Sequence, residues 1–280
     1  MIVLVASPEP QLLHLLCRAL PVGAVLSRGR RALPGLPVPV FRQLPALFEF
    51  CPRPRATVFL SPYPNIEADV AVCAQQEIPV LSAGPVALAG TPRICWGGQH
   101  RFAPLFAAAL AQRNTPEFGE AVYLRRSVGG GMGFASAWWA AWQLLEEARD
   151  LVNAAVTEVH MAACREGRQH HLALSVAFAN RATAHLVVVP HHFPASQDLT
   201  LLGTGGLLTS DHLANATAVV GAEGLRLTPP DFLRPEPAWI RDFAARLDHL
   251  SAPPDPTPAL RLRRALRRAL RQGQIVRVES

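Results

Sequence analysis

The chain has 280 residues, of which half are hydrophobic and 17% are charged. That length suits two domains, and the apolar content supports a large core, which excludes a globally disordered protein. The 27 basic residues are all arginine and outnumber the 21 acidic ones, for a formal net charge of +6. Without lysine, mechanisms that use a lysine general acid, a Schiff base or a phosphate-binding lysine are excluded.

The five cysteines are scattered, odd in number and without any CxxC pair. This pattern predicts neither a disulfide framework nor a zinc ribbon. The apolar start, residues 1–6, is short and has no basic leader, so it does not resemble a signal peptide, and no apolar run reaches membrane-spanning length. We therefore expect a cytoplasmic protein without a membrane segment.

The first 90 residues alternate between short apolar runs and amphipathic segments. Strands are predicted at Ile2–Ala6, Ala24–Leu26, Ala56–Leu60 and Pro79–Leu81, and helical segments at Gln11–Leu20, Ala46–Phe50 and Asn65–Gln76, with Asn65 as the N-cap of the last. Strands that alternate with helices favour a right-handed, parallel α/β sheet. We therefore predict a Rossmann-like domain over residues 1–92.

The remainder, residues 93–280, has the pattern of an α+β domain. Helices are predicted at Arg101–Gln112, Trp138–Asn153, Ala238–Leu250 and Ala259–Gln272, and strands at Ala121–Arg126, Leu172–Phe178, Ala184–Val189 and Leu199–Leu202. Apolar residues alternate with small or polar ones from Leu172 to Phe178, which indicates a strand with one buried face. Because tight connections join the last three runs, we expect them to pair antiparallel in an open sheet.

Several stretches, in order, resemble the glucose–fructose oxidoreductase/inositol dehydrogenase (Gfo/Idh/MocA) family. They are the strand–helix–strand region 56–81, Arg101-Phe102-Ala103-Pro104, the glycine turn 202–208, and the closing helix and strand 264–278. The resemblance implies a nicotinamide-binding Rossmann domain followed by an α+β domain with an open antiparallel sheet. It also implies a homo-oligomer that pairs through that sheet.

The residues after the first strand depart from this family. The family places glycines there, which let the pyrophosphate approach the backbone and a helix N-terminus. This chain has Ser7-Pro8-Glu9-Pro10 instead. Two prolines remove amide donors and Glu9 adds a negative charge where a diphosphate would lie, so we expect no cofactor, or NAD(P) if the protein is active.

The family's catalytic positions also differ. Its Glu-Lys-Pro motif corresponds to Ala83-Gly84-Pro85, so Gly84 replaces the lysine. Its histidine and aspartate would fall near residues 138–147, which read WWAAWQLLEE and contain no histidine. The three tryptophans share a helical face and form either part of the core or a wall on which a substrate stacks, with core packing favoured.

If a nicotinamide cofactor binds, the resemblance implies which positions would contact it: Ser7, Ser27, Arg28, Ser61, Pro62 and Pro85. The segment Ser27–Arg31 follows the second strand, where a Rossmann fold contacts the adenosine ribose, and a serine–arginine pair there would suit the 2′-phosphate of NADP. The alternative is a solvated basic loop.

Two adjacent histidines, His191 and His192, follow a predicted strand and are the candidates for proton transfer. Neighbouring strand residues point to opposite faces, so at most one of the two can enter a given site. No glutamate or cysteine stands at ligand spacing from them, so we predict no metal site.

The last predicted helix carries six arginines: Arg261, Arg263, Arg264, Arg267, Arg268 and Arg271. The simplest interpretation is an amphipathic helix with a solvated basic face. The arginines also keep open a role in binding nucleic acid or an acidic partner, although no aromatic residue lies between them.

Three functions remain. In the first, the protein is a degenerate family member that has lost NAD(P) binding and hydride transfer and serves as a binding, regulatory or partner subunit. In the second, it is an NAD(P)-dependent oxidoreductase of a sugar, polyol or related small molecule with an atypical cofactor loop. In the third, it binds nucleic acid or an acidic partner through its basic tail. The cofactor turn and the missing lysine favour the first.

Overall fold

The computed structural model describes residues 2–5, 10–27, 35–86, 93–130, 134–166, 169–190, 197–211, 216–221, 224–228, 234–247 and 257–279. The chain forms two compact units. Unit 1 comprises Met1–Gln99 with Arg234–Pro254, and unit 2 comprises His100–Leu233 with Asp255–Ser280. The change of unit at residues 99–100 lies near the predicted domain limit at residue 92, whereas the return of 234–254 to unit 1 was not predicted.

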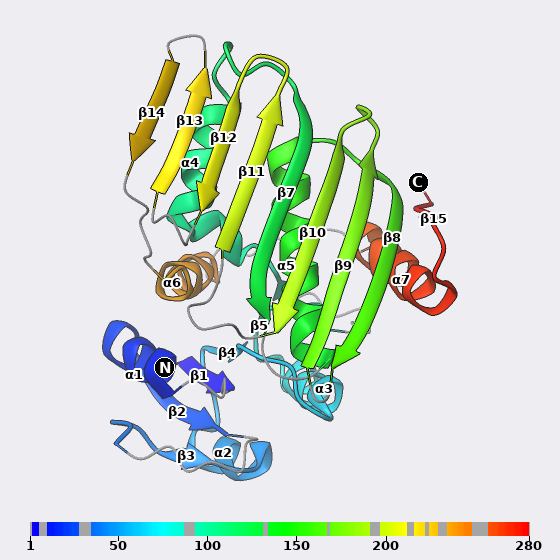
Figure 1. The fold of residues 1–280 in the computed structure, drawn as a ribbon. Coiled ribbons are helices and arrows are strands. Elements are labelled where there is room, and N and C mark those ends of the chain that lie inside the picture. Colours follow the sequence, from blue (N-terminus) through cyan, green and yellow to red (C-terminus); the bar gives the residue numbers. More distant parts are fainter. Residues whose placement is uncertain are drawn as a thin grey trace. The chain divides into compact units, whose positions relative to one another are not determined.

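Unit 1 is built on a parallel sheet with the strand order β3-β2-β1-β4-β5-β6 (Figure 1). Its strands are β1 (Ile2–Val5), β2 (Val22–Leu26), β3 (Val40–Phe41), β4 (Ala56–Phe59), β5 (Val80–Ser82) and β6 (Ile94–Trp96). Its helices are α1 (Pro10–Ala19), α2 (Leu44–Phe50), α3 (Ile66–Gln75) and α6 (Glu236–Arg246). This is the strand order of dinucleotide-binding Rossmann domains, and it confirms the predicted N-terminal fold class.

The apolar stripe of α1 is buried as its spacing predicts, with Leu13 and Leu16 fully inaccessible. Helix α3 is also where it was predicted, but Asn65 does not cap it with its side chain. Asn65 instead has a left-handed backbone (φ 68°), and its carbonyl accepts hydrogen bonds from the amides of Ala68 and Asp69. Asparagine tolerates this conformation, so the same residue type serves a turn rather than a side-chain cap.

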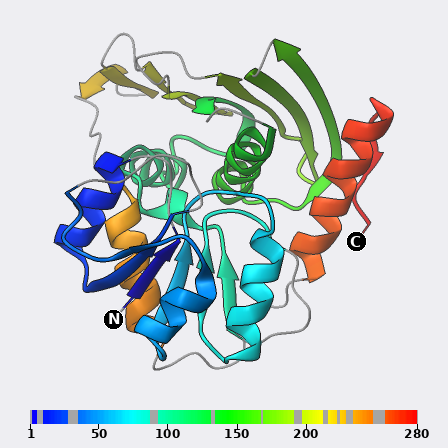
Figure 2. The same ribbon diagram turned by 90° about the horizontal axis from the view of Figure 1, so that it is seen from below.

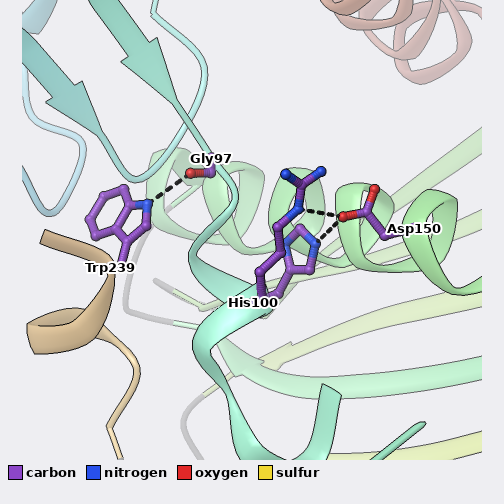
Figure 3. A network of polar contacts seen from close by, with 5 residues as sticks. Gly97, His100, Asp150 and Trp239 are labelled. Atoms are coloured by element: carbon purple, nitrogen blue, oxygen red, sulfur yellow. Dashed lines mark hydrogen bonds and ion pairs between the residues drawn. The ribbon is translucent and has the colours of Figure 1, made fainter. Parts of the chain in front are cut away.

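Helix α6 is held within unit 1 by contacts that join residues far apart in the sequence. The Trp239 indole Nε1 donates a buried hydrogen bond of 3.0 Å to the carbonyl oxygen of Gly97 (Figure 3). Arg55 also donates to the carbonyl oxygen of Ala244 at 3.1 Å. Such long-range contacts have no signature in local periodicity, which is why the sequence placed this helix in the second domain.

Unit 2 contains a mixed sheet with the order β14-β13-β12-β11-β7-β10-β9-β8-β15 (Figure 1). Its strands are β7 (Ala121–Gly130), β8 (Val156–Glu166), β9 (Gln169–Phe178), β10 (Thr183–Pro190), β11 (Gln197–Gly203), β12 (Leu207–Asp211), β13 (Ala216–Gly221), β14 (Gly224–Thr228) and β15 (Val276–Arg277). Its helices are the 3₁₀-helix η1 (Gln99–Phe102) at the boundary, α4 (Pro104–Arg113), α5 (Phe134–Val152) and α7 (Thr257–Gln272). The open, mostly antiparallel sheet confirms the second half of the predicted fold class.

Helices cover one face of this sheet, with α5 across its centre, α4 beneath β12 and α7 along β8 (Figure 2). The alternation predicted from Leu172 to Phe178 is confirmed, because Leu172, Leu174, Val176 and Phe178 are buried on that face. On the other face Ala173, Ser175 and His185 are exposed. Within the described part of unit 2, no helix covers this second face.

One predicted strand pairing is wrong. The connection between β10 and β11 is short, but the two strands are not neighbours, because β7 lies between them. Strand β7 pairs parallel with β10 and antiparallel with β11. Strands adjacent in sequence pair in only about two-thirds of cases, and loop length does not show whether an earlier strand is inserted.

No helix in the described ranges is both long enough and apolar enough to cross a bilayer.

Candidate functional site

In unit 1 the candidate positions lie where parallel strands end. Ser27 follows β2, Ser61-Pro62 follows the end of β4, and Gly84-Pro85 follows β5, so the fold brings these segments to the same edge of the sheet. In the order β3-β2-β1-β4-β5-β6, the chain adds β2 and β3 on one side of β1 and then β4, β5 and β6 on its other side, so the strand order reverses between β1 and β4. Ligands of open α/β sheets bind at such a switch point, outside the carboxyl ends of the strands.

The end of β2 is structured around the backbone of Ser27. Its amide donates a hydrogen bond of 2.8 Å to the carbonyl oxygen of Phe41, and its side chain is buried. Arg28, the other half of the proposed 2′-phosphate pair, lies outside the described residues, as does Ser7. A buried serine hydroxyl has little access to a ribose phosphate, so Ser27 gives the NADP interpretation little support.

After β5, Ser82 Oγ donates a buried hydrogen bond of 2.7 Å to the carbonyl oxygen of Gly84. Gly84 and Pro85 are themselves buried. By the resemblance, Gly84 stands at the position of the family's lysine. It has no side-chain amine, and its backbone carbonyl already accepts a hydrogen bond from Ser82. Ser82 was not singled out in the sequence, because a single serine in an apolar strand carries no distinctive signal.

A second polar contact lies just after β4, beside Ser61 and Pro62. Tyr63 donates its hydroxyl proton to Asp69 Oδ2 at 2.5 Å, and its ring stacks on Phe59 with centroids 6.4 Å apart. Asp69 is buried on α3, so this hydrogen bond compensates its lost hydration. The contact fixes the loop that carries Ser61 and Pro62.

In unit 2 the segment 138–147, where the resemblance places a histidine–aspartate pair, carries three buried tryptophans. Trp138, Trp139 and Trp142 on α5 are 8%, 6% and 1% exposed, which agrees with the interpretation that they pack in the core. Phe134 stacks on Trp138, and the Arg267 guanidinium lies 6.0 Å from the Trp138 ring centroid. His191 and His192, the other candidates for proton transfer, lie outside the described residues.

Glu147, at the end of the same segment, forms a buried ion pair. Arg126 Nε on β7 donates to both Glu147 carboxylate oxygens at 3.1 Å, and both side chains are about 6–7% exposed. Arg126 also donates to the carbonyl oxygens of Ser127 and Asp198, at 3.3 and 3.4 Å. The pair joins α5 to the centre of the sheet, and a carboxylate held in this way is a structural group rather than a free general base.

A second charged cluster in unit 2 joins η1 to the C-terminal part of α5. His100 Nε2 lies 2.9 Å from Asp150 Oδ2 (Figure 3). Arg101 Nε donates to the same oxygen at 2.7 Å. Because a carboxylate only accepts, His100 Nε2 carries the proton. The His100 ring packs edge-on against Phe106 with centroids 4.8 Å apart.

The electrostatics of this cluster favour an ionised Asp150. Burial alone would raise the pKa of Asp150, but hydrogen bonds from His100 and Arg101 outweigh it and lower that pKa to about 2. The same hydrogen bond raises the pKa of Arg101. Arg101 was seen in the sequence as part of Arg-Phe-x-Pro, whereas its partner Asp150, 49 residues later, had no signal.

An open hollow of about 600 Å³ adjoins this cluster within unit 2. Its polar lining comes from Arg101, Arg149, Asp150 and Asn153, and its apolar wall includes Phe106 and Leu110. Such a mixed lining suits water or a small charged molecule. Among the described residues, no three His, Cys, Asp or Glu side chains gather as metal ligands would.

The depressed pKa of Asp150 predicts a specific acid dependence of stability. Because the folded-state pKa lies below that of the unfolded chain, Asp150 stabilises the fold above about pH 4 and loses this effect as pH falls towards 2. In the Asp150→Asn variant, the free energy of unfolding should therefore fall less as pH is lowered from about 4 to about 2. The difference from the natural chain should be about 1 kcal/mol, because the carboxylate is partly exposed and its interactions are screened by water. Denaturant unfolding between pH 2 and 5 measures it. Glu49→Gln, at an exposed site on α2, is the control, and equal flattening by both variants would contradict the assignment.

The sequence matches no protein-family model and no curated protein. Solved structures do match over almost the whole chain. Levoglucosan dehydrogenase in complex with NADH and levoglucosan has a TM-score of 0.77 at 11% identity, with 100% of this chain and 99% of that chain covered. An oxidoreductase from Agrobacterium radiobacter in complex with NAD+, L-tartaric acid and magnesium has a TM-score of 0.73 at 15% identity, with 99% and 97% covered.

UDP-N-acetylglucosamine 3-dehydrogenase from Acidithiobacillus ferrooxidans has a TM-score of 0.73 at 15% identity, with 97% of each chain covered. At identities this low, the similarities establish the fold, and any chemical function has to be argued from the residues of this chain. The Rossmann strand order of unit 1, the open mixed sheet of unit 2 and these similarities agree: the chain shares the fold of these dehydrogenases and oxidoreductases, the fold that its resemblance to Gfo/Idh/MocA proteins implied.

Proposed function

We propose that this protein is a binding, regulatory or partner subunit built on an oxidoreductase fold that has lost NAD(P) binding and hydride transfer. The observation that carries the proposal is the start of α1, the helix that follows β1. This helix begins at Pro10, and the sequence before it reads Ser7-Pro8-Glu9.

The residues at this helix start do not fit a dinucleotide. A pyrophosphate at the N-terminus of such a helix is held by backbone amide donors and by the positive end of the helix dipole. Pro8 and Pro10 have no amide proton to donate. Glu9, which directly precedes the helix in the sequence, adds a negative charge to this segment, and like charges at close range repel.

The groups that would move protons in the resembling family are also replaced. Gly84 supplies no amine, and its carbonyl accepts from Ser82. In the segment that should contain a histidine and an aspartate, the tryptophans of α5 are buried and Glu147 is paired with Arg126. A protein that no longer catalyses hydride transfer needs neither the cofactor turn nor the proton-transfer groups, so changes at both are expected together.

Titration with NAD(H) and NADP(H) tests the proposal. We expect no binding tighter than about 1 mM by calorimetry, corresponding to a binding free energy weaker than about −4 kcal/mol. A Pro8→Gly, Glu9→Gly, Pro10→Ala variant should bind at least about tenfold more tightly, because it restores donors and removes the repulsive charge. Glu9→Gln, which removes the charge but leaves both prolines, is the matched control and should gain less.

Micromolar binding of either nucleotide by the natural chain would overturn the proposal. It would support the alternative of an NAD(P)-dependent oxidoreductase of a sugar, polyol or related small molecule with an atypical cofactor loop. In that case a substrate screen followed by the absorbance of reduced nicotinamide, with His191→Ala and His192→Ala, would test the candidates for proton transfer. Self-association through the open face of the unit 2 sheet stays a prediction of the family resemblance.

A further inference from the structure

The C-terminal helix α7 carries an arginine stripe, here defined as Arg261, Arg264, Arg268 and Arg271. These positions recur at spacings of three and four residues, so they lie on one side of the helix. The opposite side is apolar and packed, with Leu262, Leu266 and Ala269 buried where α7 contacts β8 and β15 (Figures 1 and 2). Packing therefore fixes the direction in which the stripe faces.

The stripe is exposed and positively charged. Arg264, Arg268 and Arg271 are exposed and Arg261 is partly so, and α7 has no acidic residue along its length. Among the described residues, none of these four guanidinium groups has a protein partner. Like charges at this spacing cost about 0.2–0.5 kcal/mol per pair in an exposed helix, and a bound anion would relieve this repulsion.

A small hollow of about 130 Å³ lies between α7 and β15, and three of the four stripe arginines line it. Arg261, Arg264 and Arg268 line it from the helix and Arg277 lines it from the strand, against the single carboxylate of Glu279. Its floor includes Ala265 and Val276. The Arg277 side chain is 90% exposed, and among the described residues its guanidinium makes one long contact, of 3.4 Å to Glu158, so it is available to solvent.

We propose that the arginine stripe, together with Arg277, binds the phosphate backbone of a nucleic acid duplex without sequence selectivity. Guanidinium groups donate paired hydrogen bonds to phosphate oxygens, and the charges extend over about 15 Å of helix rather than around one point, which suits a linear polyanion. No aromatic side chain lines the hollow, so the stacking that retains single strands has no platform here. This binding is independent of the loss of nicotinamide binding proposed above.

Salt dependence gives the proposal a quantitative test. The four arginines of the stripe and Arg277, if each neutralises a phosphate, predict a slope of about −4.5 for the logarithm of the binding constant against the logarithm of salt concentration. A rise from about 50 to about 200 mM salt should then weaken binding about 500-fold. Fluorescence anisotropy of a short labelled DNA duplex, titrated with the full chain, measures this slope. The same strand without its complement should bind more weakly.

Arg261→Gln, Arg264→Gln, Arg268→Gln is the test variant, and its slope should fall by about three. Arg18→Gln, Arg53→Gln, Arg93→Gln removes the same number of exposed charges from unit 1, so it is the matched control and should keep the slope. Circular dichroism melts establish that both variants are folded. Should the triple exchange in α7 impair folding, Arg268→Glu alone must still weaken duplex binding more than Arg53→Glu.

Equal losses in the two triple variants would show that only net charge matters and would overturn the proposal. Tighter binding of the single strand, or equally tight binding of poly-glutamate, would overturn it in favour of a stacking site or an acidic protein partner. Absent or salt-insensitive duplex binding would overturn it as well.

Discussion

Glu147→Ala is expected to lower the free energy of unfolding by about 3–5 kcal/mol. The substitution removes the carboxylate that accepts two hydrogen bonds from Arg126 Nε and leaves that guanidinium buried between α5 and β7. Two carbonyl oxygens, of Ser127 and Asp198, remain within reach, but at 3.3 and 3.4 Å they cannot neutralise the charge. Chemical denaturation followed by circular dichroism measures the loss.

The double variant Arg126→Met, Glu147→Leu distinguishes the net contribution of the ion pair to stability from the cost of leaving one charge buried without its partner. Apolar residues of similar volume should recover most of the stability, because a buried pair gains little beyond its own desolvation. Glu146→Ala, at the adjacent and less buried position, is the control and should change stability by about 0.5 kcal/mol or less. A Glu147→Ala protein as stable as the natural chain would mean that Arg126 is hydrated, in contradiction to its 7% side-chain exposure.

Trp142→Ala is expected to destabilise the protein by about 3–5 kcal/mol, through lost burial and the cavity left beneath the sheet. Trp142 is 1% exposed on the α5 helix that spans β7, β9 and β10. This result would distinguish core packing from a wall for substrate stacking, since a stacking residue contributes to ligand affinity rather than to folding. Thermal and denaturant unfolding measure it.

Phe134→Ala provides the comparison, because Phe134 lies on the same helix but is 40% exposed. Its loss should cost only about 1 kcal/mol, mainly from its stacking on Trp138. Similar stabilities for the Trp142 and Phe134 variants would contradict the assignment of Trp142 to the core.

Local patterns were sufficient for most elements of the fold. The apolar runs of β1, β2, β4 and β5, the alternation in β9 and the amphipathic period of α1 and α7 each follow from which side of an element is buried, a property of neighbouring residues. Helix ends were less well predicted: α5 begins at Phe134 rather than Trp138, because the first turn of a helix can extend beyond its periodic core. Strand β8, which lies between β9 and β15, was missed entirely, since its sequence VTEVHMAACRE mixes polar and apolar residues.

For the candidate site, the sequence predicted only the positions at which residues differ from those of the resembling family. Ser7-Pro8-Glu9-Pro10 and Gly84 can be read directly, because a missing amide proton or amine is a covalent property of the residue. The polar contacts within each unit are different: Arg126 with Glu147 and His100 and Arg101 with Asp150 in unit 2, and Trp239 with Gly97 in unit 1, join residues 21 to 142 positions apart.

The sequence by itself therefore determined the fold class, the burial of its strand faces and the positions, Ser7–Pro10 and Gly84, at which it departs from the resembling family. Only the tertiary structure decided that β7 enters between β10 and β11, that α6 belongs with unit 1, and that Arg277 lies beside the arginine stripe of α7. Secondary structure follows from periodicity within a few residues, whereas strand insertion and charge pairing depend on which distant segments the folded chain brings together.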